Sequence, residues 1–130
     1  MTPENTTGAV DRLLFGVLSG DMPDGIFTDD AVLDATVPNW RFTIRGGHAV
    51  REQLSQWYAV PGKFEFLERT PILGGELVEF TLMWTENGVD HTAHQAHILG
   101  VVDNIVASDT LFCGGRWPAP LVAEMQQHNS

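Results

Sequence analysis

The chain has 130 residues, with seven Lys and Arg against seventeen Asp and Glu, which gives a net charge of −10. This length corresponds to one domain, and 43% hydrophobic residues with thinly spread acidic groups exclude a disordered chain. Because an acidic protein repels phosphate groups, we expect no nucleic-acid partner and no binding to anionic membrane surfaces.

Cys113 is the only cysteine, which excludes an internal disulfide framework and a zinc site built from several cysteines. The first twenty-one residues lack the basic and apolar regions of a secretory signal, so none is predicted. The longest apolar runs are far shorter than the roughly 20 residues that cross a membrane. The sequence therefore favours a cytoplasmic protein.

Two helices are predicted in the first half of the chain. The first has apolar residues at helical spacing from Val10 to Leu18 and ends at Gly20. The second, GHAVREQLSQWY (47–58), carries its apolar residues on one face and ends before Pro61. Between them we expect a short amphipathic helix near Pro23, which suits a first helical turn.

Strands account for most of the remaining chain. AVLDATV (31–37) alternates in polarity and predicts a strand, and RFTIRGG (41–47) predicts a short strand or a loop. Four longer strands follow in segments 63–73, 76–88, 89–104 and 105–117, separated by turn-forming pairs such as Asn87-Gly88 and Asp103-Asn104. The tail after residue 117 predicts a closing helix.

This order of elements predicts an α+β fold within a single domain, 1–130. Consecutive long hairpins form a strongly curved antiparallel sheet, and N-terminal helices on its inner face turn that sheet into a cone that encloses a pocket.

Five short motifs occur in a particular order: SGD at 19–21, FTDDAVLDATVP at 27–38, RGGHAVREQL at 45–54, HILGVVDNI at 97–105 and GGRW at 114–117. With this order and spacing, the sequence resembles the SnoaL-like branch of the nuclear transport factor 2-like superfamily over residues 7–118. The resemblance implies the cone fold and a homodimer. It does not imply one reaction, because this fold carries isomerases, dehydratases, epoxide hydrolases, cyclases and proteins without activity.

The resemblance also indicates which side chains line the cone. On the strand that ends at Pro38, it implies inward-facing polar residues two and four positions earlier, which are Thr36 and Asp34 here. On the third long strand it places Gln95 and His97 inside. Alternation then puts His94 on the opposite face.

The last strand offers two possible registers. Regular alternation turns Ser108, Thr110 and Phe112 inward and Asp109 outward, whereas a β-bulge would turn Asp109 inward. Related cyclases and hydrolases carry an inward acid near this position. Asp109 is therefore a catalytic candidate, and Ser108, Thr110 and Phe112 are candidates for substrate binding. The outer faces of these strands, with Ala96, Ile98, Leu111 and Cys113, are apolar enough for a homodimer.

Asp34 and His97 are the main catalytic candidates, because each lies in an otherwise apolar strand where an ionisable group is costly unless it has a partner. Facing each other across a cone, they would form an acid–base pair suited to enolisation, dehydration or cyclisation. The alternative is structural: Asp34 bonded to Arg41 or Arg45, and His97 a core imidazole with a satisfied hydrogen bond.

The remaining candidates concern ligand contacts. Trp40 follows a Pro-Asn pair and is predicted to cover an apolar ligand, and Tyr58 could reach the pocket from its helix or belong to the core. The spacing of His91, His94 and His97 resembles a metal-binding tract, but on a strand it sends His94 to the other face, so no metal is predicted. Cys113 is interpreted as structural, and the pair Arg116-Trp117 as closing the sheet edge by ion pairing and stacking.

These observations favour an enzyme of the isomerase, cyclase or dehydratase (lyase) type that uses no cofactor and acts on a small apolar, oxygen-bearing metabolite of polyketide or terpenoid kind. One alternative is a non-catalytic module of the same fold that binds a ligand or dimerises. Another is an epoxide hydrolase, although the Asp–Arg–Asp set expected for that chemistry is not visible in the sequence.

Overall fold

The structure, a computed structural model, describes residues 8–129. The elements along the chain are α1 (Ala9–Ser19), β1 (Phe27–Val37), β2 (Trp40–Arg45), α2 (Gly47–Trp57), β3 (Lys63–Ile72), β4 (Gly75–Glu86), β5 (Val89–Val102), β6 (Ile105–Cys113), β7 (Trp117–Pro118) and α3 (Ala119–His128). Both predicted N-terminal helices and all the predicted strands are present. The short helix expected near Pro23 is wrong, because this segment is a turn that leads into β1.

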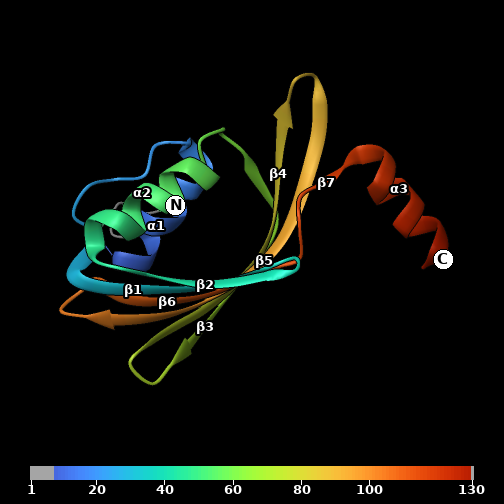
Figure 1. Ribbon diagram of the computed structural model, residues 1–130. Helices are drawn as coiled ribbons and strands as arrows, with labels where there is room; N and C mark the ends of the chain where they lie inside the picture. Colours follow the sequence, from blue (N-terminus) through green and yellow to red (C-terminus); the bar gives the residue numbers. More distant parts are fainter. Residues whose placement is uncertain (1–7, 130) are drawn as a thin grey trace.

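The strands form one curved sheet in the order β2-β1-β6-β5-β4-β3, with the short β7 paired to β5. All neighbouring strands run antiparallel except β1 and β6, which are parallel. Figure 1 shows α1 and α2 together on one side of the curved sheet. This arrangement confirms the predicted α+β cone, with one parallel pair inside an otherwise antiparallel sheet.

The core lies between the two N-terminal helices and the concave face of the sheet. Leu13 and Val17 of α1 and Leu54 of α2 are almost fully buried there, against strand residues such as Leu33 and Phe80. Helix α1 ends at Gly20, which takes the left-handed backbone conformation (φ 76°) that is common at helix ends. Helical and strand periodicities thus direct their apolar faces to one shared interior.

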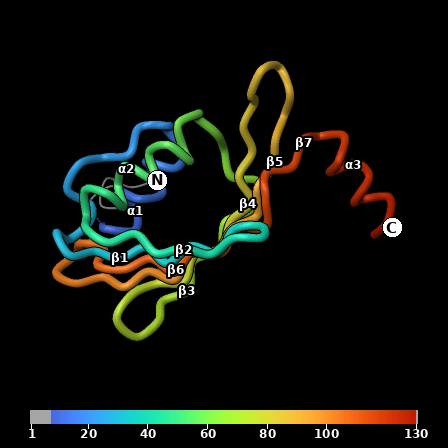
Figure 2. Tube along the Cα trace, in the orientation of Figure 1, coloured from blue at the N-terminus to red at the C-terminus, as the bar shows by residue number. Residues whose placement is uncertain are grey.

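Tight turns fix the register of the hairpins. Asp103 and Asn104, between β5 and β6, both have positive φ, as do Asn87 and Gly88 between β4 and β5. Two consecutive positive φ angles match the twist of a two-residue β-hairpin and favour Asn, Asp and Gly. The Cα trace in Figure 2 shows the β4–β5 hairpin extending well beyond the rest of the sheet.

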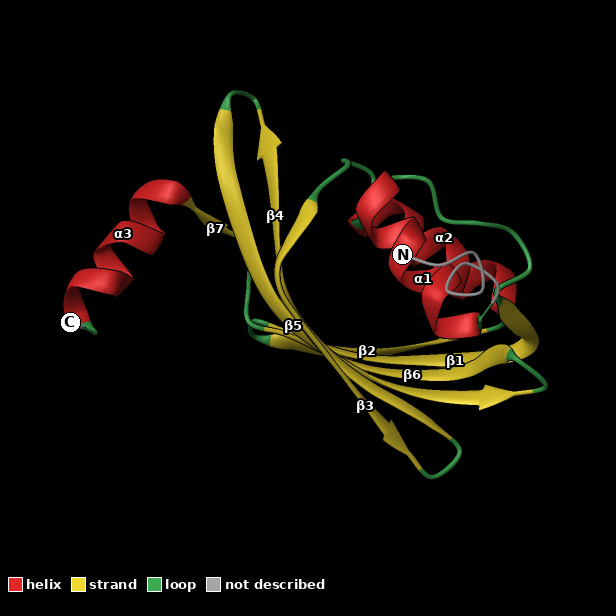
Figure 3. Cartoon of the chain, turned by 180° about the vertical axis from the view of Figure 1, so that it is seen from behind, coloured by secondary structure: helices red, strands yellow, loops and turns green. Residues whose placement is uncertain are grey.

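The C-terminal helix α3 is the least integrated element. Figure 3 shows it projecting from the sheet on the side away from α1 and α2. None of its residues is buried, and its described contacts are with β5 and β7. The predicted helix is present, but it does not close over the cone. None of the described helices is long and apolar enough to cross a membrane.

Candidate active site

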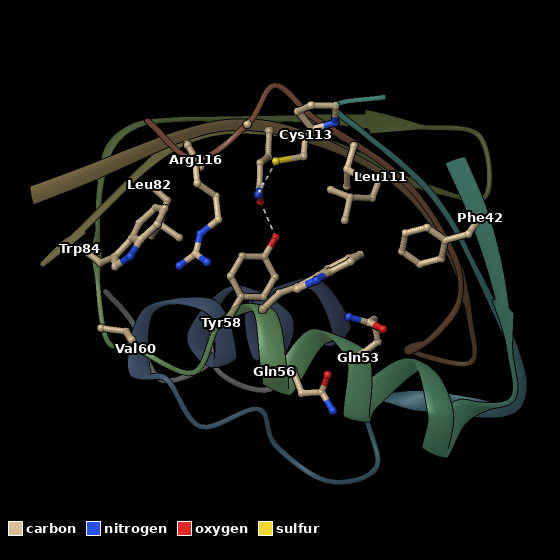
Figure 4. A pocket seen from close by; sticks show the side chains of 16 residues that line it. Phe42, Gln53, Gln56, Tyr58, Val60, Leu82, Trp84, Leu111, Cys113 and Arg116 are labelled. Atoms are coloured by element: carbon tan, nitrogen blue, oxygen red, sulfur yellow. Dashed lines mark hydrogen bonds between the residues drawn. The ribbon is translucent and has the colours of Figure 1, made fainter. Parts of the chain in front are cut away.

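A cavity of about 600 Å³ lies between α2 and the concave face of the sheet (Figure 4). This volume is typical of small-molecule sites, and most of its wall is apolar or aromatic. The wall includes Val37, Pro38, Phe42, Gln53, Gln56, Trp57, Tyr58, Val60, Leu82, Trp84, Ala93, Gln95, Leu111, Cys113, Gly115 and Arg116.

A chain of hydrogen bonds runs from the cavity wall into the protein interior. Tyr58, which follows the last turn of α2, donates its hydroxyl hydrogen to Gln95 Oε1 on β5, and the Tyr58 hydroxyl oxygen lies 3.1 Å from His97 Nε2. His97 Nδ1 lies 2.7 Å from Asp109 Oδ2 on β6. At the other end, Gln95 Nε2 donates to Cys113 Sγ at 3.2 Å.

The members of this chain differ in their access to the cavity. Tyr58 and Gln95 are part of the cavity wall, whereas His97 and Asp109 each expose 1% of their side chains and lie behind it. The His97 ring stacks on Phe80, with ring centroids 5.5 Å apart. A ligand in the cavity can therefore contact the Tyr58 hydroxyl directly. His97 contacts that hydroxyl from the protein interior, and Asp109 contacts His97.

Burial sets the chemistry of Tyr58. Loss of water around the phenol raises the pKa of Tyr58 well above its ordinary value, and the nearby charges of Asp109 and Cys113 raise it further. Tyr58 is therefore a neutral phenol at physiological pH and donates a hydrogen bond. The Oδ1 atom of Asp109 is buried and has no hydrogen-bond donor among the described residues.

Arg116 reaches the cavity from the segment after β6. Its Nη2 atom lies 2.6 Å from Glu86 Oε1, and its guanidinium group lies over the Trp84 ring, 5.0 Å from the ring centroid. The Trp84 indole N–H donates to the same Glu86 oxygen at 3.0 Å. That indole hydrogen bond, together with the positive charge of Arg116, lowers the pKa of Glu86. Arg116 thus has an ion pair and a ring contact, as expected for the Arg116-Trp117 pair, but its ring partner is Trp84, and its place on the cavity wall was not predicted.

The predicted inward position of Asp34 and Thr36 is wrong. On β1 the buried residues are Ala31, Leu33 and Ala35, and Asp34 faces the other side of the sheet. There Arg41 forms a two-point ion pair with Asp34, with distances of 3.1 and 2.7 Å. The apolar set of β1 faces the helices because its burial removes more apolar surface from water. The Arg41 guanidinium lowers the pKa of Asp34, which is therefore an ordinary carboxylate on the outer face.

The regular register expected for the last strand is also wrong. Gly100 of β5 pairs with Ser108, but Val101 pairs with Val106, so Ala107 is an extra residue in β6. This bulge turns Asp109 and Leu111 inward and leaves Ser108, Thr110 and Phe112 on the outer face, where Phe112 is 47% exposed. The alternative register with a bulge is the observed one. Leu111 and Cys113, expected outside, lie on the cavity wall.

The remaining predicted residues are divided. Gln95 and His97 face the interior, as the resemblance implied, and His94 faces the outer side, as alternation along β5 then predicted. Tyr58 is on the cavity wall. Trp40 is 69% exposed and is not part of that wall, so its predicted covering position is not observed. The wall also includes Gln53 and Gln56, which were not predicted, although their helical spacing to Trp57 was a usable signal.

Within residues 8–129, no group of three or more His, Cys, Asp or Glu side chains is placed to hold a metal ion. His91 stacks on Trp84, and His94 bonds to Thr81 and Glu79 on the outer face.

No protein-family model matches the sequence, and no match was found among curated proteins. Solved structures do match. An NTF2-like protein from Anabaena variabilis superposes with a TM-score of 0.70 at 15% identity, over 88% of this chain and 95% of that one. A limonene-epoxide-hydrolase-like (LEH-like) epoxide hydrolase from M. tuberculosis gives 0.65 at 17% identity, over 85% and 83%.

A third structure is SalBIII, an epoxide hydrolase/cyclase-like enzyme with a role in pyran ring formation in the polyether salinomycin. It superposes with a TM-score of 0.63 at 16% identity, over 82% of this chain and 88% of that one. The chain thus has the nuclear transport factor 2-like fold, the class that the sequence resemblance implied. At these identities the likeness concerns the fold, and the reaction has to be argued from the site.

Proposed function

We propose that the protein is a small-molecule enzyme that performs acid–base chemistry without a cofactor, as an isomerase, dehydratase or cyclase. The single observation that carries this proposal is the hydrogen-bonded chain from Tyr58 on the cavity wall through His97 to Asp109. Fold neighbours that include a cyclase-like enzyme agree with it.

The hydrogen-bonded groups Tyr58, His97 and Asp109 can move one proton in either direction. In the first step, the Tyr58 hydroxyl hydrogen turns from Gln95 Oε1 to His97 Nε2, 3.1 Å away, and passes to it while the Tyr58 oxygen accepts a proton from the substrate. The imidazolium that forms faces the Asp109 carboxylate at 2.7 Å, which stabilises its charge. In the second step the proton returns through Tyr58 to a different substrate atom.

The destination of that proton defines the reaction. Return to another carbon or oxygen of the same substrate is an isomerisation. Delivery to a leaving hydroxyl releases water, and delivery to the alkoxide formed by a ring closure completes a cyclisation. Because the pKa of Tyr58 is raised, the neutral phenol is its resting form, and its one O–H hydrogen can turn from Gln95 Oε1 to the substrate oxygen where charge develops.

The cavity wall supports an apolar, oxygen-bearing substrate. Its apolar residues include Phe42, Trp57, Val60, Leu82 and Leu111. About 600 Å³ accommodates a molecule of two or more fused rings or a folded chain of similar size. A polyketide- or terpenoid-like metabolite has this character.

A non-catalytic ligand-binding module is the second candidate, and one observation favours it. His97 is 1% exposed and already has hydrogen-bond partners on both ring nitrogens, which is the arrangement of a structural imidazole. In such a module Tyr58 would bind a ligand oxygen, and no proton would be transferred.

Epoxide hydrolysis has less support. Among the described residues that form the cavity wall, Arg116 is present but no aspartate stands beside it, and Asp109 is bonded to His97 instead.

We propose in addition that the protein is a cytoplasmic homodimer that associates through the outer sheet face, where Ile98 and Phe112 are exposed. The molecular mass of the protein in solution tests whether it is a homodimer.

Proton transfer through Tyr58 and His97, called the proton relay below, is tested by the turnover of β-hydroxy and β,γ-unsaturated cyclic ketones. Dehydration and isomerisation of these ketones both yield a conjugated enone with a strong ultraviolet absorbance. We expect Tyr58→Phe to lower kcat by about 100-fold or more, a size typical of losing a general acid–base group. The matched outer-face variant Asp34→Asn should leave kcat unchanged. Full activity of both Tyr58→Phe and His97→Gln on a substrate that the wild type converts would exclude the relay and leave the binding module.

A further inference from the structure

The cavity has a second polar region, apart from the Tyr58 hydroxyl. Figure 4 shows the Arg116 guanidinium group extending into the cavity near Trp84, with Phe42 and Leu111 on the other side of Tyr58. Among the described wall residues, Arg116 is the only cation, and no carboxylate is present. A ligand that fills the cavity therefore meets a phenol hydroxyl group at Tyr58 and a positive charge near Trp84.

Arg116 is held in place before a ligand arrives. Glu86 binds Nη2 at 2.6 Å, and the Trp84 ring lies under the guanidinium plane. Trp84 in turn is 8% exposed and donates to the same Glu86 oxygen, so that all three groups brace one another. A guanidinium group that is already oriented loses less conformational entropy on binding than a mobile one.

The braced guanidinium keeps donors available. Guanidinium groups carry five N–H donors, and the described contact with Glu86 uses one nitrogen, Nη2. No described residue accepts a hydrogen bond from Nε or Nη1 of Arg116. Because Nη2 carries two N–H groups, one edge of the guanidinium group, formed by Nη2 with either Nε or Nη1, still presents a planar pair of N–H groups that matches the two oxygens of a carboxylate.

From this arrangement we propose that the substrate carries a carboxylate, bound by Arg116, as well as the oxygen that Tyr58 contacts. The inference rests on the proposed function, because it assigns a second recognition group in the same cavity. A carboxylate fits better than a phosphate, since Glu86 already offsets part of the positive charge and a doubly charged phosphate would face one partly neutralised arginine.

Two probes of the same shape isolate the contribution of charge. Both 6-hydroxy-2-naphthoate and 6-hydroxy-2-naphthamide have an apolar two-ring body with a hydroxyl at one end, but only the first is an anion at neutral pH. We expect wild-type protein to bind the naphthoate about fivefold to tenfold more tightly than the naphthamide, as measured by calorimetry at low salt. Added salt should reduce this ratio.

Variants assign the ratio to Arg116. Arg116→Gln keeps a polar side chain without charge and should bring the ratio to about one, while Glu86→Gln removes the competing carboxylate and should increase it. Arg41→Gln, an exposed arginine on the outer face, is the matched control and should leave the ratio unchanged. Thermal unfolding checks that each variant is folded.

The outcomes separate this inference from the proposed function. A wild-type ratio of one, or a ratio that survives Arg116→Gln, would overturn the carboxylate assignment, as would a ratio that falls in Glu86→Gln. If the ratio depends on Arg116 while Tyr58→Phe binds both probes as tightly as wild type, the carboxylate site stands and the role of Tyr58 fails. Failure of both probes to bind wild-type protein would overturn both proposals.

Discussion

Asp34 and Asp109 lie on paired neighbouring strands, yet they have opposite surroundings. In the parallel pairing of β1 and β6, Asp34 is opposite Thr110, and Asp109 is opposite Leu33. The two carboxylates are thus one residue apart in register and face opposite sides of the sheet. Asp34 is paired with Arg41 near solvent, whereas Asp109 is buried against His97.

The difference shows how a sheet of this kind separates solubility from chemistry. On the outer face water and Arg41 solvate a carboxylate, so that its charge has little influence on other groups. On the inner face, Asp109 has His97 as its described partner, and charges interact more strongly there because the surroundings are less polarisable. Asp34 thus adds a charged group to the surface, whereas Asp109 interacts with His97 and, through it, with the Tyr58 phenol next to the cavity.

Stability should show the largest contrast between the two carboxylates. Asp109→Leu leaves a buried imidazole N–H without its acceptor, and we expect a loss of about 2–4 kcal/mol in the free energy of unfolding. Asp34→Leu should change it far less, because its ion pair is exposed to solvent. Urea unfolding of the two variants measures both. Equal losses would contradict the assignment of inner and outer faces.

The second largest effect that we expect concerns the ionisation of Tyr58. Tyr58 is the only tyrosine, so the phenolate absorbance reports it alone. Its raised pKa predicts no ionisation in the folded protein at pH 10, where a tyrosine in an unfolded chain is half ionised. Stability should therefore fall as the pH rises above that value, because the unfolded state then binds fewer protons.

The same titration sharpens the comparison. Asp109→Asn removes a negative charge that raises the pKa of Tyr58, so ionisation should begin at lower pH than in wild type. Asp34→Asn should leave the titration curve unchanged. A shift of equal size in both variants would mean that Tyr58 responds to net charge and not to Asp109.

The smallest predicted effect concerns Asp34 itself. Because Arg41 lowers the pKa of Asp34, this pair stabilises the fold above the ordinary aspartate pKa, and its contribution is lost as the pH falls through the lowered value. Arg41→Gln should raise the pKa of Asp34 toward its ordinary value, as followed by NMR of the side-chain carboxyl. An unchanged pKa would show that the ion pair does not form in solution.

Much of the fold follows from local patterns in the sequence. Helical spacing from Val10 to Leu18 and turn pairs such as Asp103-Asn104 act over a few residues and can be identified without a structure. On β5 the resemblance indicated that Gln95 and His97 lie inside, and alternation then placed His94 outside, because this strand is long and regular.

The site could be predicted only in part, since it depends on pairing between distant strands. The extra residue Ala107 reverses the facing of every later residue of β6, and nothing in the local sequence distinguishes it from a regular position. For β1, polarity alone would have placed Leu33 and Ala35 inside, whereas the resemblance suggested Asp34. The carboxylate partner predicted for His97 is therefore Asp34 on β1, whereas the observed partner is Asp109 on β6.

The most direct test of the central claim is whether His97 responds to the contents of the cavity. In ¹⁵N NMR spectra of the imidazole side chains, 2-naphthol serves as the probe, because its hydroxyl can bond to Tyr58 while its rings fill the apolar wall. The account predicts that saturating 2-naphthol shifts the ring nitrogens of His97, that Tyr58→Phe abolishes this shift, and that His94 on the outer face does not respond. Binding of 2-naphthol in the cavity with unchanged His97 signals would contradict the account.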